Sequence, residues 1–204
     1  MPPAIHHRKA INHLRKSDPV LAQIISQVGP CRYEVKDFGT HFDALCRSII
    51  FQQLSTKAAS TIHGRFLDLF ANRVPTPDAV LDIGEERLRA VGLSGQKTRY
   101  IRDLAEQVHT GALPLDHVGS LSDADVIAHL VQVKGIGVWT AQMFLMFRLG
   151  RLDVLPDLDL GIRNAIKKAY RVRGVPTPKR IAKIGEPWRP YASIACWYLW
   201  RSLD

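Results

Sequence analysis

Apolar residues recur at helical spacing along almost the whole chain, and this periodicity restricts the fold more than any other feature of the sequence. The segment HFDALCRSIIFQQLSTKAASTIHGRFLDLF, for example, carries one repeating apolar stripe from Phe42 to Leu69. Helix starts are indicated where Thr76 precedes Pro77 and where Ser122 precedes two aspartates. Alternating strand patterns are scarce. The sequence therefore predicts an all-α protein of about nine or ten short helices.

Two irregular stretches interrupt the helical pattern. GPCRYEVKDFGTH precedes the first strong helix pattern, and RLDVLPDLDLG separates two later helices. We interpret them as two crossings between lobes. The chain is thus expected to form two helical lobes with a cleft between them, one built from residues 38–150 and the other from residues 1–37 plus 151–204.

Charge and cysteine content limit the class of partner and the compartment. The formal net charge of +9 favours an acidic partner, either nucleic acid or an anionic membrane surface, and the alternative is a charge that only aids solubility. Cys31, Cys46 and Cys196 form no CxxC pair, which argues against a structural zinc site or an iron–sulfur cluster and is typical of reduced thiols. Neither a signal peptide nor a transmembrane-length apolar run is visible. We expect an intracellular protein, located in the cytoplasm or nucleoid if bacterial and in the nucleus if eukaryotic.

The stretch VKGIGVWTA at residues 133–141 joins two helical patterns and predicts a helix-hairpin-helix motif at 126–149. Gly135 and Gly137 can adopt backbone angles closed to other residues, so both are expected to permit the tight reversal. The N–H groups that begin the second helix form an anion site, and Lys134 stands beside it. A DNA phosphate fits there without base reading. A glycine-rich connection with no ligand is the alternative, and the basic charge favours DNA.

One carboxylate follows this motif in the segment DVLPDLDLGIRNAI. Pro156 breaks the preceding element and helical spacing resumes after Asp159, so this residue is expected at or near a helix start. An acidic N-cap explains such a residue structurally. The negative charge of DNA would however repel a carboxylate held close to a phosphate site. Its presence therefore indicates chemistry.

Five stretches, in order from residue 49 to 200, carry a resemblance to a known family: IIFQQLSTKAASTIHGRF, VGLSGQKTRYIRDLAE, VKGIGVWTAQMFLM, DVLPDLDLGIRNAI and EPWRPYASIACWYLW. The chain resembles the helix-hairpin-helix superfamily of base-excision DNA glycosylases, in its 3-methyladenine DNA glycosylase II branch. The resemblance implies a monomer on double-stranded DNA that flips and excises damaged bases. The implied substrates are alkylated purines, namely 3-methyladenine, 7-methylguanine and possibly ethenoadenine. The N-terminal β domain of the best-known member and the cysteine cluster of the endonuclease III branch are not expected here.

The resemblance also assigns roles to residues of this chain. Asp159 matches the catalytic aspartate of the family. Trp139 stands where bifunctional relatives carry a nucleophilic lysine, which implies a monofunctional enzyme without a lyase step. The base pocket is assigned to Trp139, Trp188 and Phe42, whereas Trp197 and Trp200 are expected in the core.

Further positions are assigned to the DNA and to an ion. Gln53 or Leu54 would be the wedge that fills the gap left by the flipped nucleotide. The DNA-binding positions are Gln53, Leu54, Ser55, Lys134, Gly135, Gly137, Val138 and Thr140. No cofactor is required, although the backbone carbonyls of Val131, Val133 and Ile136 match those that hold a Na⁺ or K⁺ at the hairpin of relatives.

The chemistry implied for Asp159 leaves two roles open. The carboxylate would stabilise the positive charge that develops on the sugar, or it would orient or deprotonate a water. No second carboxylate is compelling as a general acid, which suits a base that is already cationic. Two other functions remain open, a non-catalytic helix-hairpin-helix module that binds or senses damaged DNA, and a glycosylase for mismatched or oxidised bases.

Overall fold

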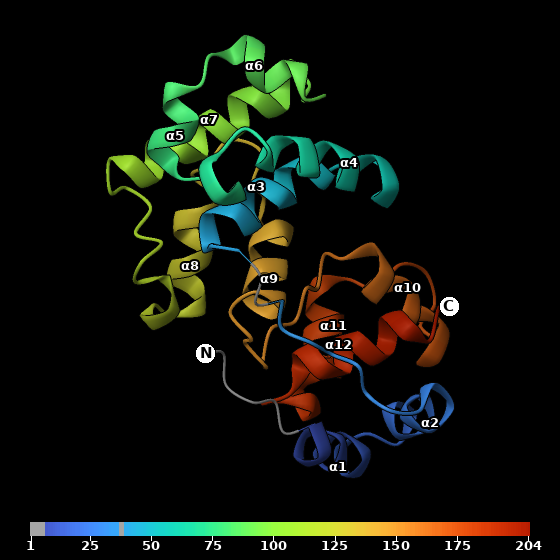
Figure 1. Cartoon of the computed structure of the whole chain (residues 1–204). Helices are drawn as coiled ribbons and strands as arrows, with labels where there is room; N and C mark the ends of the chain where they lie inside the picture. Colours follow the sequence, from blue (N-terminus) through green and yellow to red (C-terminus); the bar gives the residue numbers. More distant parts are fainter. Residues whose placement is uncertain (1–6, 37–38) are drawn as a thin grey trace. The chain divides into compact units, whose positions relative to one another are not determined.

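The computed structural model describes residues 7–36 and 39–204, and no strand occurs among them (Figure 1). The predicted all-α class is therefore confirmed. The chain divides into two compact units, residues 37–144 and residues 1–36 with 145–204. We call them the central unit and the terminal unit. In the described residues, no helix combines the length and the apolar character needed to span a bilayer.

The central unit is organised around its long helix α7. It contains α3 (His41–Phe51), α4 (Thr56–Leu67), η1 (Ala71–Arg73), α5 (Pro77–Asp82), α6 (Glu85–Ala90), α7 (Gly95–His109), η2 (Val118–Ser120), α8 (Asp123–Leu130) and most of α9 (Val138–Phe147). Helix α7 packs against α3, α5 and α6. Leu45 and Ile49 of α3 and Ile101 and Leu104 of α7 have no exposed surface. Burial of each such side chain contributes about 1.5–3 kcal/mol.

The terminal unit brings the two chain ends into one core around α12. Its elements are α1 (His7–Ser17), α2 (Pro19–Val28), α10 (Leu160–Ala169), α11 (Pro178–Gly185), η3 (Glu186–Trp188) and α12 (Ala192–Arg201). Helix α12 packs against α1, α2 and α10. In Figure 1 the first two helices are dark blue and α12 is red. This core positions the start of α10, where Asp159 lies.

Side-chain caps start eight of the helices in the described residues. Each capping oxygen accepts a backbone N–H from the first turn, which satisfies a donor that has no partner within the helix. The caps are Asp18, Thr40, Ser55, Thr76, Ser94, Ser122, Asp159 and Thr177. The predicted starts at Thr76 and Ser122 are confirmed.

The number and the limits of the helices differ from the sequence expectation. The described residues contain twelve α-helices where nine or ten were expected, partly because α1 and α2 were not predicted. In α1 only Ala10 and Leu14 are buried, so its apolar face is too narrow to recognise in the sequence. The long apolar stripe from Phe42 to Leu69 is not one helix, because residues 52–55 separate α3 from α4.

The last turn of α9 belongs to the terminal unit. The hydroxyl of Tyr33 donates to the carbonyl oxygen of Met146 at 2.5 Å, and the backbone N–H of Lys36 donates to that of Phe147 at 2.7 Å. These bonds tie the end of α9 to the segment that leaves α2. The compact units therefore divide after residue 144 and not after residue 150. Whether the lobes fold as separate domains stays a prediction.

Candidate active site and DNA-binding hairpin

The carboxylate of Asp159 is half-buried at the start of α10. Its Oδ1 accepts the backbone N–H of Ile162 at 2.7 Å and the indole Nε1–H of Trp200 at 2.8 Å. The predicted helix-start position is confirmed, and the N-cap interaction is present as well. Because the two donors come from α10 and α12, the orientation of the carboxylate is fixed by the packing of these helices.

Gly161 makes room for the contact between Asp159 and Trp200. A Cβ atom at position 161 would lie 2.8 Å from Cδ1 of Trp200 and 3.0 Å from Oδ1 of Asp159. Both distances are shorter than ordinary van der Waals contact, so any side chain here would displace the indole or the carboxylate. The ring of Trp200 in turn lies against Phe147, with centroids 6.1 Å apart.

Trp200 is a hydrogen-bond partner of Asp159 that the sequence did not reveal. Its spacing on α12 led to the expectation of a core side chain, but the residue is half-buried and donates to the proposed catalytic carboxylate. The prediction that Trp200 only fills the core is therefore wrong. No local pattern could reveal the pairing, because Asp159 and Trp200 are 41 residues apart.

Two leucines next to Asp159 in the sequence are exposed. Leu158 and Leu160 keep 60% and 69% of their surface accessible. Exposed apolar side chains beside a charged group suit the docking of a partly apolar ligand such as a nucleotide. Neither residue was predicted to belong to the site.

Cys196 lies on α12, close enough to Asp159 for the charge of the carboxylate to affect the pKa of its thiol. Burial raises the pKa of this thiol well above its usual value, and the negative charge of Asp159 raises it further. The thiol therefore stays protonated near neutral pH and cannot act as a nucleophile. Cys31, Cys46 and Cys196 are all free.

The hairpin, residues 131–137, connects α8 to α9. The backbone N–H of Ile136 donates to the carbonyl of Val133 at 3.0 Å. Gly135 has φ +83°, and a Cβ atom there would overlap the ring of Tyr100. Gly137 does not adopt a positive φ and has open space where a Cβ would lie. Of the two glycines expected to permit the reversal, only Gly135 has backbone angles that disfavour other residues.

The backbone nitrogen and the Nζ atom of Lys134 both interact with the carboxylate of Asp103. Its backbone N–H donates to Oδ2 of Asp103 at 2.9 Å, and its Nζ lies 2.8 Å from Oδ1 of the same carboxylate. Burial acts to raise the pKa of Asp103, but the hydrogen bonds from Lys134 outweigh it and lower this pKa. Asp103 thereby anchors the hairpin to α7 and partly neutralises Lys134. A phosphate contact by Lys134 stays a prediction.

The wedge loop, residues 52–55, is attached to both the hairpin and α7. The Gln52 side-chain amide donates to the carbonyl of Gly135 at 2.8 Å. The ammonium of Lys97 donates to the carbonyls of Ile50 and Gln52, each at 2.7 Å. Burial lowers the pKa of Lys97. Two of these hydrogen bonds thus join Gln52 of the loop to the hairpin and to α7, and the third joins the end of α3 to α7.

The predicted wedge residues project from this loop. Gln53 is exposed and adopts φ +57°, an uncommon conformation for a residue other than glycine. Leu54 keeps 40% of its surface accessible, and Ser55 caps α4. The exposure of Gln53 and Leu54 fits a wedge, and the choice between them stays open.

The predicted residues at the start of α9 differ in accessibility. Trp139 and Val138 are exposed by 50% and 44%, so both can meet a ligand. Thr140 is only 8% exposed. Of the three, Thr140 therefore offers a phosphate the least surface.

The structure contradicts the base-pocket role predicted for Trp188 and argues against that role for Phe42. Trp188 has no exposed surface, and its Nε1–H donates at 2.8 Å to Oδ2 of Asp18, which also accepts the hydroxyl of Tyr170 at 2.6 Å. The prediction that Trp188 lines an open pocket is wrong, because the ring is a core residue of the terminal unit. Phe42 is 4% exposed on α3 and offers a base almost no surface.

The proposed cation ligands lie in the hairpin itself. The carbonyl of Val133 accepts the N–H of Ile136, which leaves its second lone pair for a cation. The carbonyls of Val131 and Ile136 are the other two oxygens that this prediction requires. Within residues 7–36 and 39–204, no group of three or more His, Cys, Asp or Glu side chains is placed to hold a metal ion. An ion at the hairpin stays a prediction based on backbone oxygens alone.

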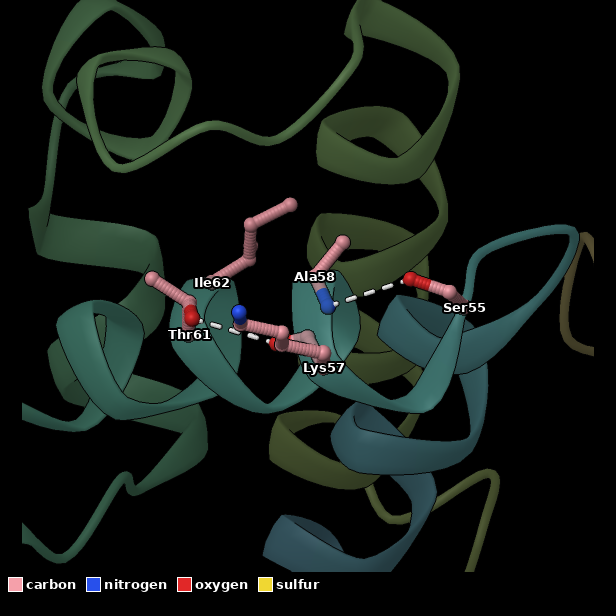
Figure 2. A pocket seen from close by; sticks show the side chains of 5 residues that line it. All are labelled: Ser55, Lys57, Ala58, Thr61 and Ile62. Carbon is pink, nitrogen blue, oxygen red and sulfur yellow. Dashed lines mark hydrogen bonds between the residues drawn. The ribbon is translucent and has the colours of Figure 1, made fainter.

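A shallow pocket of about 400 Å³ lies on α4, directly after the wedge loop. Figure 2 shows the residues that line it, Ser55, Lys57, Ala58, Thr61 and Ile62. The Ser55 hydroxyl accepts the N–H of Ala58 at 3.3 Å, and the Thr61 hydroxyl donates to the carbonyl of Lys57 at 3.1 Å. None of the predicted base-pocket residues lines this pocket, so it is distinct from the predicted base site.

The chain also matches a known protein family and named relatives. Residues 46–190 match the family described as HhH-GPD superfamily base excision DNA repair protein. The DNA-3-methyladenine glycosylase 1 of Schizosaccharomyces pombe is 36% identical over 200 residues, which cover 95% of this chain and 86% of that protein.

Two solved structures are also similar. The S. pombe 3-methyladenine DNA glycosylase in complex with abasic DNA matches with a TM-score of 0.80 and 36% identity, over 95% of this chain and 96% of that one. The DNA-3-methyladenine glycosidase of Bacillus halodurans matches with a TM-score of 0.84 and 37% identity, over 95% of this chain and 88% of that one.

Proposed function

Because the chain belongs to the HhH-GPD superfamily of base excision DNA repair proteins, we propose that it is a DNA glycosylase that removes alkylated purines from double-stranded DNA. The observation that carries the proposal is the carboxylate of Asp159, held at the start of α10 by donors from two helices. The expected substrates are 3-methyladenine and 7-methylguanine, with ethenoadenine as a further candidate. We further propose that the protein acts as a monomer inside the cell, where its DNA substrate is found.

Asp159 acts on the sugar as the N-glycosidic bond breaks. The bonding electron pair leaves with the base, and positive charge develops at C1′ of the deoxyribose. An ionised carboxylate stabilises that charge, and a water then adds to C1′ and loses its proton. Trp200 is the positioning residue that keeps Oδ1 of Asp159 in place. An alkylated, cationic purine departs without a general acid, which fits the lack of a second assigned carboxylate.

Trp139 is proposed to contact the flipped base. Its indole, half of whose surface is accessible, would attract a cationic ring through cation–π interaction, worth about 0.5–2 kcal/mol. Because an indole stands at this position instead of a lysine, no covalent Schiff-base intermediate is expected. The product is then an intact abasic site.

The hairpin and the wedge loop are proposed to hold the DNA. The open space at Gly137 would let a phosphate approach the N-terminal end of α9, where the helix dipole favours an anion. Gln53 or Leu54 would fill the gap in the base stack and offset part of the few kcal/mol that flipping costs. The carbonyls of Val131, Val133 and Ile136 would hold a Na⁺ or K⁺, whose charge would add to the attraction for phosphate.

The decisive experiment compares Asp159→Asn with Asp157→Asn in single-turnover excision from duplexes that carry methylated, etheno, deaminated or oxidised bases. We expect Asp159→Asn to lower the excision rate of alkylated purines by about 10²-fold or more while affinity for abasic DNA persists. Asp157→Asn changes a neighbouring carboxylate and should retain most of the activity. A wild-type protein that binds abasic DNA but excises none of these bases would instead be a non-catalytic binding module.

A further inference from the structure

The positive charge of the protein is distributed very unequally between the two units. The central unit, which carries the hairpin and the wedge loop, contains ten Lys and Arg against twelve Asp and Glu. The terminal unit contains 18 Lys and Arg against seven Asp and Glu. The formal net charges are therefore −2 and +11, so the basic character does not reside in the unit with the DNA-binding motif.

Most of this surplus lies in one segment of the terminal unit. Residues 160–185 contain eight Lys and Arg and no Asp or Glu. Seven of these side chains are exposed, and we call them the basic surface: Lys167, Lys168, Arg171, Arg173, Lys179, Arg180 and Lys183. They lie at the end of α10, in the loop that follows it, and on α11.

The basic surface lacks counter-charges in the described part of the chain. No ion pair of the described residues involves any of its seven side chains. In the central unit, by contrast, Lys134 and Arg73 pair with carboxylates, and Lys97 and Arg102 donate to backbone carbonyls. Cations without internal partners keep their full attraction for an external anion.

The start of α11 is tied to the first turns of α10. Arg163 lies four residues after Asp159, about 6 Å along the helix axis. Its Nε donates to the carbonyl of Pro176 at 3.3 Å, two residues before α11 begins. Lys179 follows Pro176 by three residues, at most about 11 Å of extended chain. The start of α11, which carries Lys179, is thus anchored to α10 about one helical turn after Asp159.

Lys179, Arg180 and Lys183 share one side of α11. Positions 179 and 183, and 180 and 183, are neighbours on a helix surface, whereas Ile181 of the same helix is fully buried. An interfacial membrane helix would need its apolar side free to insert into lipid. Here that side is buried in the terminal unit, so the exposed cations suit a phosphate backbone better than a bilayer.

We propose that the basic surface binds phosphates of the duplex that flanks the target nucleotide and supplies most of the salt-dependent DNA affinity. The proposal rests on the proposed function in taking duplex DNA as the ligand. The surface then contributes sequence-independent affinity, whereas the hairpin, the wedge loop and Asp159 act at the damaged nucleotide. This role concerns residues of α10 and α11 outside the helix-hairpin-helix motif.

The test compares two triple variants with the same change in net charge. Lys179→Gln/Arg180→Gln/Lys183→Gln removes three cations of the basic surface. The matched control, Arg65→Gln/Arg87→Gln/Arg89→Gln, removes three exposed cations of the central unit. Affinity for an undamaged duplex is measured over a range of salt concentrations. Because each phosphate contact contributes about 0.9 to the slope of log K against log salt, we expect the first variant to lose about 2 to 3 from that slope.

The control variant should keep the slope, and the first variant should excise alkylated purines at the wild-type single-turnover rate once DNA is saturating. An unchanged slope in the first variant, or an equal loss in the control, would overturn the proposal. Loss of binding to vesicles containing phosphatidylserine, with duplex affinity retained, would overturn it too. The double variant Lys167→Gln/Lys168→Gln, on another helix, repeats the test if the triple variant unfolds. Since undamaged duplex is the ligand, this outcome does not depend on whether Asp159 is catalytic.

Discussion

The central unit and the terminal unit offer different chemical groups to an anionic polymer such as DNA. The central unit offers the backbone of the hairpin, with open space at Gly137, and the wedge loop, while its cations Lys134 and Lys97 are engaged within the protein. The terminal unit offers a carboxylate in a fixed orientation and a segment of cations without internal partners. A helix-hairpin-helix motif therefore need not lie in the basic part of a DNA-binding protein, since backbone donors can bind phosphate without a net positive charge.

The two units also differ in what holds their key groups. In the central unit, Lys97 and Gln52 bind backbone carbonyls, so the wedge loop depends on side chains from α7 and on the hairpin. In the terminal unit, Asp159 depends on an indole N–H and on the missing side chain of Gly161. Substitution of Lys97 or Gln52 should therefore affect DNA binding and stability, whereas substitution of Trp200 or Gly161 should affect the rate of base excision.

The largest effect is expected for Gly135→Ala in the central unit. The new methyl group would overlap the ring of Tyr100 and would occupy a left-handed conformation, so we expect a loss of stability of about 2 kcal/mol or more. Gly137→Ala is the matched control, because its Cβ meets open space. We expect Gly137→Ala to keep the thermal unfolding midpoint but to weaken binding of abasic DNA. Equal stability of the two variants would contradict the assignment of Gly135 as the turn residue.

An intermediate effect is expected for Gly161→Ala and Trp200→Phe in the terminal unit. The first variant crowds the carboxylate, and the second removes the indole donor while it keeps an aromatic ring. Displacement of a catalytic group by about 1 Å can cost about 10²-fold in rate, so we expect a 10- to 100-fold lower single-turnover excision rate. Affinity for abasic DNA should stay close to wild type. If affinity and rate fell together, Trp200 would be a structural residue and not a positioning residue.

The smallest effect concerns the anchor of the hairpin in the central unit. The folded-state pKa of Asp103 is lowered, so its contribution to stability is complete above the unfolded-state pKa near 4 and is lost as the pH falls through the lower folded value. We therefore expect the unfolding midpoint of Asp103→Asn to lie below that of the wild type at pH 6 and to converge with it toward pH 2. A difference that stays constant down to pH 2 would show that Asp103 stabilises the hairpin by something other than its charge.

Much of the site was predictable from local sequence. The KGIG turn between two apolar helices located the hairpin, and Pro156 together with the helical spacing after it located Asp159 at a helix start. These features depend on a few neighbouring residues, whose backbone preferences are the same in any fold. Trp188 and Trp200 could not be assigned in this way. Both stand in an aromatic-rich helical region, and only their packing partners distinguish a core ring from a site ring.

The sequence by itself determined the helical class, the position of the turn and the total charge of the protein, because periodicity, glycine and side-chain charge act locally or additively. Only the tertiary structure decided where that charge is concentrated, which glycine adopts the left-handed conformation, and which indole orients Asp159. These properties depend on residues that are far apart in the chain and meet only through burial of their shared apolar surface. Packing, and not sequence proximity, therefore brought Trp200 to the proposed catalytic carboxylate.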